Sequence, residues 1–264
     1  MPRRKRTSIS KDAFGPGFAE FFSEIFEAQG LDYLHDVVVG STSSDFYVEA
    51  PSGSTTIFEF KAWQPTKANL ERASHQASLY RRTSGADSAF VVIPGEFASD
   101  PSSGVVSTGQ FQEFIEDNVV TAPRKPGAKP PTVKPKPKDH IFASMPFSKL
   151  YDDTYLVAMK PAAIDSGFDC VRVDHEQFTG DVVAEIKRLI TDGIAVVADL
   201  SDSRPNVLHE IGYAEGLGKP IVQICTDRDK LPFNVRNNKT LKYSIGQTSR
   251  LRASLGKELS SLLV

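Results

Sequence analysis

Two patterns of hydrophobic and polar positions divide this chain of 264 residues. Up to residue 120, apolar residues alternate with polar ones or recur every three to four positions, which is typical of strands and helices with one exposed side. From residue 139 onward, nearly continuous apolar runs alternate with amphipathic segments, which is typical of strands buried on both faces. The chain is therefore predicted to form two α/β units, residues 13–120 and 139–264, after a basic tail at 1–12.

The first unit is predicted to hold a β-hairpin between helices. Residues 13–30 repeat phenylalanine and isoleucine at helical spacing, and residues 45–61 alternate apolar and polar side chains around a Pro-Ser-Gly turn. The other predicted elements are a helix at 67–82, a buried strand at 89–93 and a helix that begins at 111–116. The order helix, hairpin, helix, strand, helix predicts an α/β core.

The hairpin carries two carboxylates and a lysine. Successive side chains of a strand point to opposite faces, so Glu59 and Lys61 project together, and hairpin pairing brings Asp45 toward Glu59. Two carboxylates so placed suit a hard cation such as Mg²⁺ or Mn²⁺, and the lysine suits orienting a water or offsetting charge on a phosphate. Alternatively, Glu59 and Lys61 are two solvated charges opposite a packed face.

The ordered set of Asp45, the pair Glu59 and Lys61, and a helix with Gln76 and Tyr80 resembles the PD-(D/E)xK nuclease superfamily, in particular its Mrr-like restriction endonucleases. The resemblance covers residues 13–120 and implies a restriction-endonuclease-like fold. It also implies that Asp45 and Glu59 bind the metal, that Lys61 assists the attacking water and that Gln76 supports the site.

The same resemblance implies that a glutamate of the first helix joins the site. Glu20 is the position that we carry over, and Glu24, one turn later, is the alternative unless both are surface residues. Ser44 stands where the family usually has a proline, a change that does not touch the chemistry. His75, next to Gln76 on the predicted helix, is interpreted as a surface residue rather than a general base.

Residues 121–138, TAPRKPGAKPPTVKPKPK, separate the two units. Proline fixes φ and removes backbone donors, so this segment is predicted to be an extended polyproline spacer without a core of its own. It holds six Lys or Arg residues and no acid, whereas residues 8–120 hold 6 basic and 16 acidic residues. The basic segments either help to hold nucleic acid or only keep the spacer extended and soluble.

The second unit alternates strands with helices. Strands are predicted at 140–146, 168–173, 194–200 and 220–225, and helices at 153–166, 181–191 and 207–217. Buried strands separated by amphipathic helices predict a parallel sheet with helices on both faces, of the flavodoxin or Rossmann kind.

Polar residues gather where these predicted strands end. Ligands of open parallel sheets bind beyond the carboxyl ends of the strands, so these residues form a predicted ligand site. The candidates are Ser144, Phe147, Ser148, Asp199, Asn206 and Glu210. For Asp199, an interpretation of equal weight is that it holds the loop at 201–204 and does not contact a ligand.

The segment VVADLSDSRPNVLHEIGYAEGLGKPIVQI, with FASMPFS before it and LPFN after it, resembles nucleoside 2-deoxyribosyltransferases and their TIR-like nucleotide-binding relatives. The likeness spans residues 139–245. It implies that Glu210 is in the position of the glutamate that attacks the anomeric carbon in the transferases. Other relatives bind nucleotides or nucleotide-derived signals, so both a catalytic and a sensing role stay open.

Composition adds limits on location. The formal net charge is -2, no apolar run approaches the roughly 20 residues of a membrane span, and the N-terminus lacks the apolar stretch of a signal peptide. Two cysteines do not make a disulfide framework. We therefore expect a cytoplasmic protein that does not enter a membrane.

Together these patterns favour a Mg²⁺-dependent DNA endonuclease controlled by a nucleotide-sensing unit, and the pairing resembles bacterial antiphage effectors. The expected partners are DNA, a nucleotide or nucleotide-derived ligand and further copies of the chain. One alternative is an N-glycoside hydrolase or deoxyribosyltransferase that uses Glu210, with a nuclease-like unit that only binds nucleic acid. The other is a binding module in which both sites are inactive.

Overall fold

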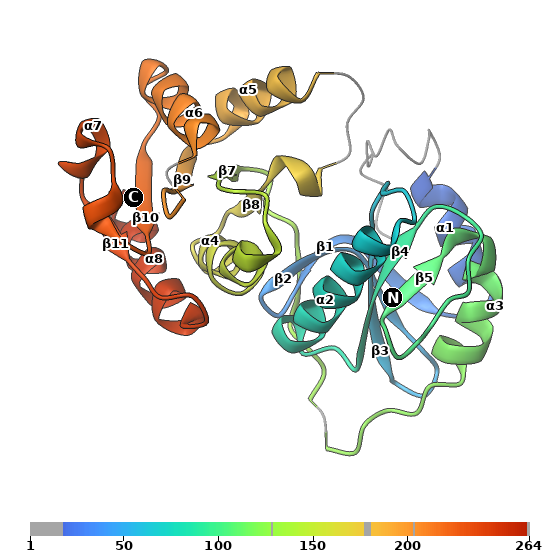
Figure 1. Cartoon of the computed structure of the whole chain (residues 1–264). Helices are drawn as coiled ribbons and strands as arrows, with labels where there is room; N and C mark the ends of the chain where they lie inside the picture. Colours follow the sequence, from blue (N-terminus) through green and yellow to red (C-terminus); the bar gives the residue numbers. More distant parts are fainter. Residues whose placement is uncertain (1–17, 128, 177–180, 203, 263–264) are drawn as a thin grey trace.

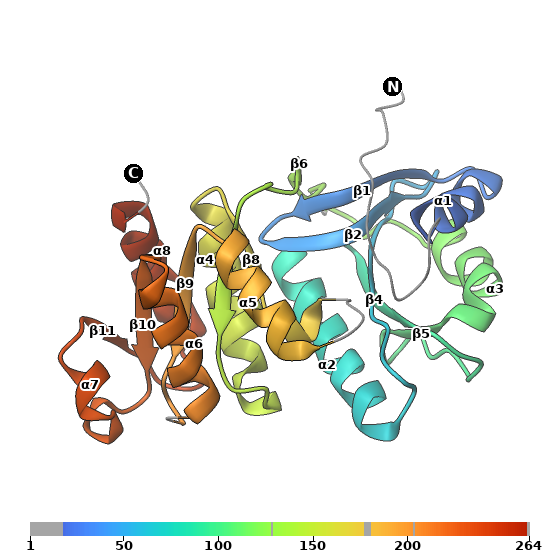
Figure 2. The ribbon, with the colours of Figure 1, turned by 90° about the horizontal axis from the view of Figure 1, so that it is seen from above.

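The protein, represented by a computed structural model that describes residues 18–127, 129–176, 181–202 and 204–262, is a mixed α/β structure. It contains one six-stranded sheet and one five-stranded parallel sheet, and helices flank both (Figures 1 and 2). The general α/β prediction is confirmed at this level. The basic tail and the start of the first predicted helix, residues 13–17, lie outside the described residues. In the described ranges no helix combines the length and the apolarity that a membrane crossing requires.

The first sheet has the strand order β5-β4-β3-β2-β1-β6. Strands β1, β2 and β3 form an antiparallel meander, whereas β3, β4 and β5 run parallel. The strands are β1 (Asp32–Val39), β2 (Thr42–Glu49), β3 (Thr55–Phe60), β4 (Ser88–Ile93), β5 (Val105–Ser107) and β6 (Val133–Pro135). The predicted hairpin and the predicted strand at 89–93 are thus present, and β1, β5 and β6 are additions.

Three helices cover this sheet. Phenylalanines of α1 (Phe18–Ala28) and α3 (Phe111–Ile115) pack on the face that carries Phe46, Phe58 and Phe60. Helix α2 (Lys67–Ser84) packs on the opposite face. It begins after Thr66, whose hydroxyl accepts a hydrogen bond from the backbone N of Asn69, and it ends at Gly85, which has a φ of 75°. The two faces therefore have separate cores.

The predicted spacer needs one correction, because its last part is a strand. Val133 to Pro135 pair antiparallel with Val37 to Val39 of β1, and Gly40 N donates to Thr132 O at 2.8 Å. A proline is tolerated there because β6 is the edge strand and has only one neighbour to bond. Residues 133–135 are therefore extended but belong to the first sheet, and the chain turns at residues 126–127, where Gly127 has a φ of 76°.

The second sheet has the order β11-β10-β9-β7-β8 and all of its pairings are parallel. Its strands are β7 (His140–Ser144), β8 (Asp169–Val171), β9 (Ala195–Asp199), β10 (Ile221–Cys225) and β11 (Thr240–Lys242). Its helices include α4 (Lys160–Asp165), α5 (Val182–Asp192), α6 (Pro205–Gly216), α7 (Phe233–Arg236) and α8 (Thr248–Leu262). Helices α4 and α8 share a core with one face, and α5 and α6 share a core with the other.

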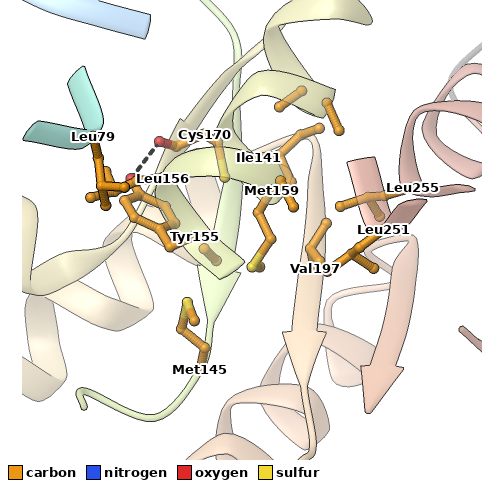
Figure 3. Packing of buried hydrophobic residues seen from close by; sticks show 14 of the residues in the cluster. Leu79, Ile141, Met145, Tyr155, Leu156, Met159, Cys170, Val197, Leu251 and Leu255 are labelled. Carbon is orange, nitrogen blue, oxygen red and sulfur yellow. Dashed lines mark hydrogen bonds between the residues drawn. The ribbon is translucent and has the colours of Figure 1, made fainter. Parts of the chain in front are cut away.

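We call residues 18–120 with β6 the N-terminal unit and residues 139–262 the C-terminal unit. A single buried hydrophobic cluster joins them, from Tyr47 and Ile57 of the first sheet, through Leu79 of α2, to the second sheet. Figure 3 shows Leu79 beside Leu156 and Tyr155, whose hydroxyl donates to the Cys170 carbonyl at 2.8 Å. The units therefore pack against each other, with α2 at the junction (Figure 2).

Candidate functional site

The pairing of β2 and β3 ends at Phe46 and Phe58, just before the candidate carboxylates. Beyond that pair, side chains replace the backbone ladder. Asp45 Oδ2 accepts from Phe60 N at 2.8 Å, and Ser44 Oγ donates to Phe58 O at 2.9 Å. Because Phe46 and Phe58 face α1, the alternating positions of Asp45 and Glu59 face α2 and the C-terminal unit.

Lys61 and Gln76 complete this group. Lys61 Nζ lies 2.9 Å from Glu59 Oε1, and the amide of Gln76, on α2, lies 2.7 Å from the Tyr80 hydroxyl. Asp45, Glu59, Lys61 and Gln76 are all buried, with exposed fractions of 2 to 6%. The structure therefore brings four of the five predicted nuclease positions to one face of the sheet.

Glu20 is the exception. It lies on α1, whose phenylalanines Phe18 and Phe22 pack on Phe60 at ring-centroid distances of 4.7 and 4.4 Å. That contact is on the face opposite to Lys61, and the Glu20 side chain is exposed. The prediction that Glu20 joins the buried group is therefore not met in this arrangement, because α1 covers the other side of the sheet.

The C-terminal unit covers the candidate site with the segment that follows β8. Lys61 Nζ donates to the His175 carbonyl at 2.8 Å, and the Gln76 amide lies 3.3 Å from His175 Nδ1. Trp63 packs edge-on against the His175 ring at 6.3 Å between centroids. A polymer could not reach the four buried side chains unless this segment moved.

Arg172 holds the covering segment in place. Its guanidinium is fully buried and donates to Asp152 at 2.8 Å, to Asp174 at 2.6 Å and to His175 Nε2 at 2.7 Å. It also lies 4.6 Å from the centre of the Tyr155 ring. A guanidinium can only donate, so Nε2 of His175 accepts and the neutral ring keeps its proton on Nδ1.

The protonation states around Arg172 follow from burial and charge. Burial lowers the pKa of His175 well below its ordinary value, and the nearby charges of Arg172 and Lys61 lower it further. Burial acts to raise the pKa of Asp174, but Arg172 and Arg72 outweigh it and the pKa is lowered. The histidine is therefore neutral and the aspartate ionised near pH 7.

Another buried carboxylate, that of Glu210, lies in the C-terminal unit where the strand order reverses. Glu210 on α6 accepts a hydrogen bond from Ser144 Oγ, at the end of β7, at 2.5 Å. Burial raises the pKa of Glu210 to about 7, and the Ser144 hydroxyl opposes that shift. Since β7 has β8 on one side and β9 on the other, this carboxyl end is the point at which open α/β sheets bind ligands.

The other predicted ligand positions have different settings. Asp199 ends β9 and accepts from Tyr243 Oη at 2.6 Å and from Ser201 Oγ at 2.5 Å, so it holds the loop after the strand. Burial raises its pKa against these hydrogen bonds. Phe147 and Asn206 are exposed, and Ser148 caps the helical turn at 149–151. The structure pairs Ser144 with Glu210, and it places Asp199 in a loop-holding network of its own.

The donor set of the candidate site fits a hard cation. Asp45 and Glu59 supply carboxylate oxygens at the same end of two neighbouring strands, and Mg²⁺ is commonly bound by one or two carboxylates while it keeps several waters. Among the described residues no group of three or more His, Cys, Asp or Glu side chains could hold a metal ion. A cation at this site would therefore rest on two carboxylates and water.

Sequence reasoning missed the residues that cover the site. Arg172 was included in a predicted strand, and the polar run Arg172-Val-Asp-His175 that follows β8 received no role. The position of this run directly after β8 was a usable signal, because polar residues just beyond a parallel strand lie at the edge of the sheet where ligands bind. Lys136 was assigned to the spacer, yet its ammonium lies 3.0 Å from Asp169 of β8.

Comparison with known proteins adds no family. No protein-family model matches the chain, and no curated protein matches it. A solved structure titled as glycerate kinase 2 from Salmonella typhimurium LT2 aligns over 90% of this chain and 82% of its own, with 11% identity and a TM-score of 0.19. A likeness that low carries no argument about fold or function.

Proposed function

We propose that the protein is a metal-dependent DNA endonuclease whose activity is controlled by its C-terminal unit. The observation that carries the proposal is the meeting of Asp45, Glu59, Lys61 and Gln76 on one sheet face, from three elements that are separate in sequence. Two carboxylates, an ammonium and an amide at the end of the β2–β3 hairpin suit the hydrolysis of a phosphodiester.

Each side chain has a distinct role in that reaction. Asp45 and Glu59 would hold Mg²⁺, or Mn²⁺, which when bound supplies a Lewis acid and lowers the pKa of a coordinated water. Lys61, freed from His175, would orient the attacking water and offset the negative charge on the phosphate. Gln76, fixed by Tyr80, would support the position of Lys61 and the water.

We take the N-terminal unit as restriction-endonuclease-like, because a hairpin with the site at its end is followed by the Gln76 helix and then by a parallel strand. The C-terminal strands, numbered within that unit, have the order 2-1-3-4-5, which flavodoxin-like doubly wound sheets share. A nucleotide or nucleotide-derived ligand at Ser144 and Glu210 would act as the signal, as in the antiphage effectors that the sequence resembles.

The decisive experiment compares plasmid cleavage by wild type, Lys61→Ala and Lys257→Ala with Mg²⁺ or with EDTA. Lys257 is an exposed lysine on α8 of the C-terminal unit, so it is the matched control. We expect Mg²⁺-dependent cleavage that Lys61→Ala lowers about 100-fold or more and that Lys257→Ala retains. Cleavage by Lys61→Ala at the wild-type rate would exclude the assigned role.

A second candidate, an N-glycoside hydrolase or transferase, is favoured by one observation. A carboxyl with a pKa of about 7 is partly protonated at neutral pH, which suits proton donation to a leaving base better than attack as a nucleophile. The test is release of free base from nucleosides or NAD by wild type and by Glu210→Gln. Base release that disappears in Glu210→Gln supports this candidate, and release that persists excludes it.

A further inference from the structure

The basic residues between positions 18 and 120 are confined to α2 and the end of β3. Between residues 18 and 120 the sequence has 15 acidic residues and 5 basic ones. All five basic residues lie directly after β3 or on α2, namely Lys61, Lys67, Arg72, Arg81 and Arg82. Since phosphate contacts dominate affinity for DNA, α2 and the strand ends beside it are the part of residues 18–120 that a duplex can approach most favourably.

Strand β6 brings a further cation to the same region. Lys136 follows β6 directly, and its backbone N donates to Asp36 O of β1 at 3.0 Å. The negative charges of Asp169, Glu176 and Glu59 stabilise the protonated ammonium of Lys136 and raise its pKa. The pairing of β6 with β1 thus fixes a lysine beside the candidate active site.

Oxygens of the C-terminal unit meet three of these cations. Arg72 binds the Asp174 carboxylate and lies 3.5 Å from Asp152. Lys136 lies 3.0 Å from Asp169. Lys61, the third cation, donates to a carbonyl of the same unit, that of His175. Charged nitrogen atoms facing anionic or carbonyl oxygens are the arrangement that lysine and arginine also make with DNA phosphates.

We propose that these oxygens occupy the positions of DNA phosphates, so that the C-terminal unit and a DNA duplex compete for one face formed by Lys61, Arg72 and Lys136. The inference deepens the proposed nuclease function, on which its substrate class rests. It assigns Arg72 and Lys136 as phosphate contacts, and it assigns the acidic surface of Asp152, Asp169 and Asp174 as a DNA mimic.

The hydrogen bonds of the connecting segment show where the hinge between the two units lies. Strand β6 stays with the N-terminal unit because it is hydrogen-bonded to β1, and β7 begins at His140 in the other sheet. Lys136 N is bonded to Asp36 O of β1, and Asp139 O accepts from Asp169 N of β8, so the units can separate by rotation at Pro137 and Lys138. A hinge this short keeps the C-terminal unit tethered next to the DNA face, which favours closure whenever DNA is absent.

Binding of a fluorescent DNA duplex in EDTA tests the competition without any need for cleavage. Asp174→Ala removes the partner of Arg72, while Arg172 keeps Asp152. Asp192→Ala removes the same charge from an exposed helix end, where Asp192 pairs with Arg188, and serves as the control. We expect Asp174→Ala to bind DNA about tenfold more tightly than Asp192→Ala, by anisotropy at one fixed salt concentration. Equal affinities of the two variants would overturn the proposal.

A reversible lock covers the case in which Asp174→Ala does not fold. Glu71 and Lys149 are exposed and form an ion pair across the units at 3.1 Å, and the native Cys170 and Cys225 are buried. Glu71→Cys with Lys149→Cys, joined by a cleavable bis-maleimide, should lose DNA binding at least tenfold and regain it after the linker is reduced. Undiminished binding by the locked protein would overturn the proposal.

The phosphate contacts are tested in the Asp174→Ala background. Arg72→Gln and Lys136→Gln should each weaken DNA binding and lower the slope of log affinity against log salt by about 1. Slopes that equal that of the Asp174→Ala parent would remove those residues from the face. Plasmid cleavage with Mg²⁺ is measured separately. If the variants change DNA binding as expected but the protein never cleaves the plasmid, the nuclease function is rejected and the competition between DNA and the C-terminal unit is retained.

Discussion

Glu59 and Glu210 are buried to nearly the same extent, with exposed fractions of 6 and 5%, but their surroundings differ. Glu59 pairs with the Lys61 ammonium at 2.9 Å, in an interface crowded with charges. Glu210 has a serine hydroxyl and no charged group that moves its pKa, so burial raises that pKa to about 7. Equal burial therefore does not give two carboxylates the same chemistry. A paired carboxylate suits a cation, and a desolvated one suits the movement of a proton.

The largest predicted effect tests whether the interface depends on compensated charge. Arg172→Met keeps the length and much of the volume of the side chain, but it leaves Asp152 and Asp174 without their buried cation. We expect the free energy of unfolding, measured in urea, to fall by about 3–5 kcal/mol, because an uncompensated buried charge is strongly unfavourable.

The control for that prediction is Arg188→Met. Arg188 also pairs with two carboxylates, Glu185 and Asp192, but it lies exposed on α5. An exposed pair contributes little, so this variant should unfold within about 1 kcal/mol of wild type. Equal losses for Arg172→Met and Arg188→Met would show that burial of the Arg172 network is unimportant.

The next largest effect concerns Glu210 and pH. The folded-state pKa, about 7, is above the ordinary value of 4.5, so the stability that Glu210 contributes is complete below pH 4.5 and is lost as the pH rises through 7. Relative to Glu210→Gln, wild type should therefore lose about 3 kcal/mol of unfolding free energy between pH 4.5 and pH 8. Urea unfolding at several pH values measures the difference.

Glu215→Gln is the control for the pH prediction, because Glu215 is exposed on the same helix. Its stability curve against pH should follow that of wild type. If Glu210→Gln also followed wild type, the contrast between a paired and a desolvated carboxylate would not hold.

The two sites also differ in how far the sequence predicts them. Alternation in β2 and β3 and the apolar runs of β7, β9 and β10 are local signals, and the structure has strands at each of those places. Strand β1 was missed because Asp32, His35 and Asp36 interrupt its pattern, and β6 because its prolines favour a spacer. Helix α8 had a usable signal, since Leu251, Leu255 and Leu259 repeat every four residues and are buried.

The cover over Lys61 could not be predicted in the same way. Burial of Arg172 depends on Asp152, Asp174 and Tyr155, which come from different elements, and no periodicity records that meeting. Glu210 and Ser144 were both predicted to belong to one ligand site, because the carboxyl ends of the strands of one parallel sheet share an edge. A site within one sheet is therefore accessible to sequence reasoning, whereas a contact between two sheets requires the structure.

The smallest predicted effect separates the rim of the interface from its centre. Glu71→Ala with Lys149→Ala removes an ion pair that joins the units but whose side chains are 55 and 52% exposed. Exposed pairs are screened and cost side-chain entropy, so the melting temperature should stay within about 2 °C of wild type. Thermal unfolding followed by circular dichroism measures this. A clear drop would mean that the rim pairs, rather than Arg172 and its carboxylates, hold the C-terminal unit over Lys61, and that the charged site is covered by surface contacts that salt alone could release.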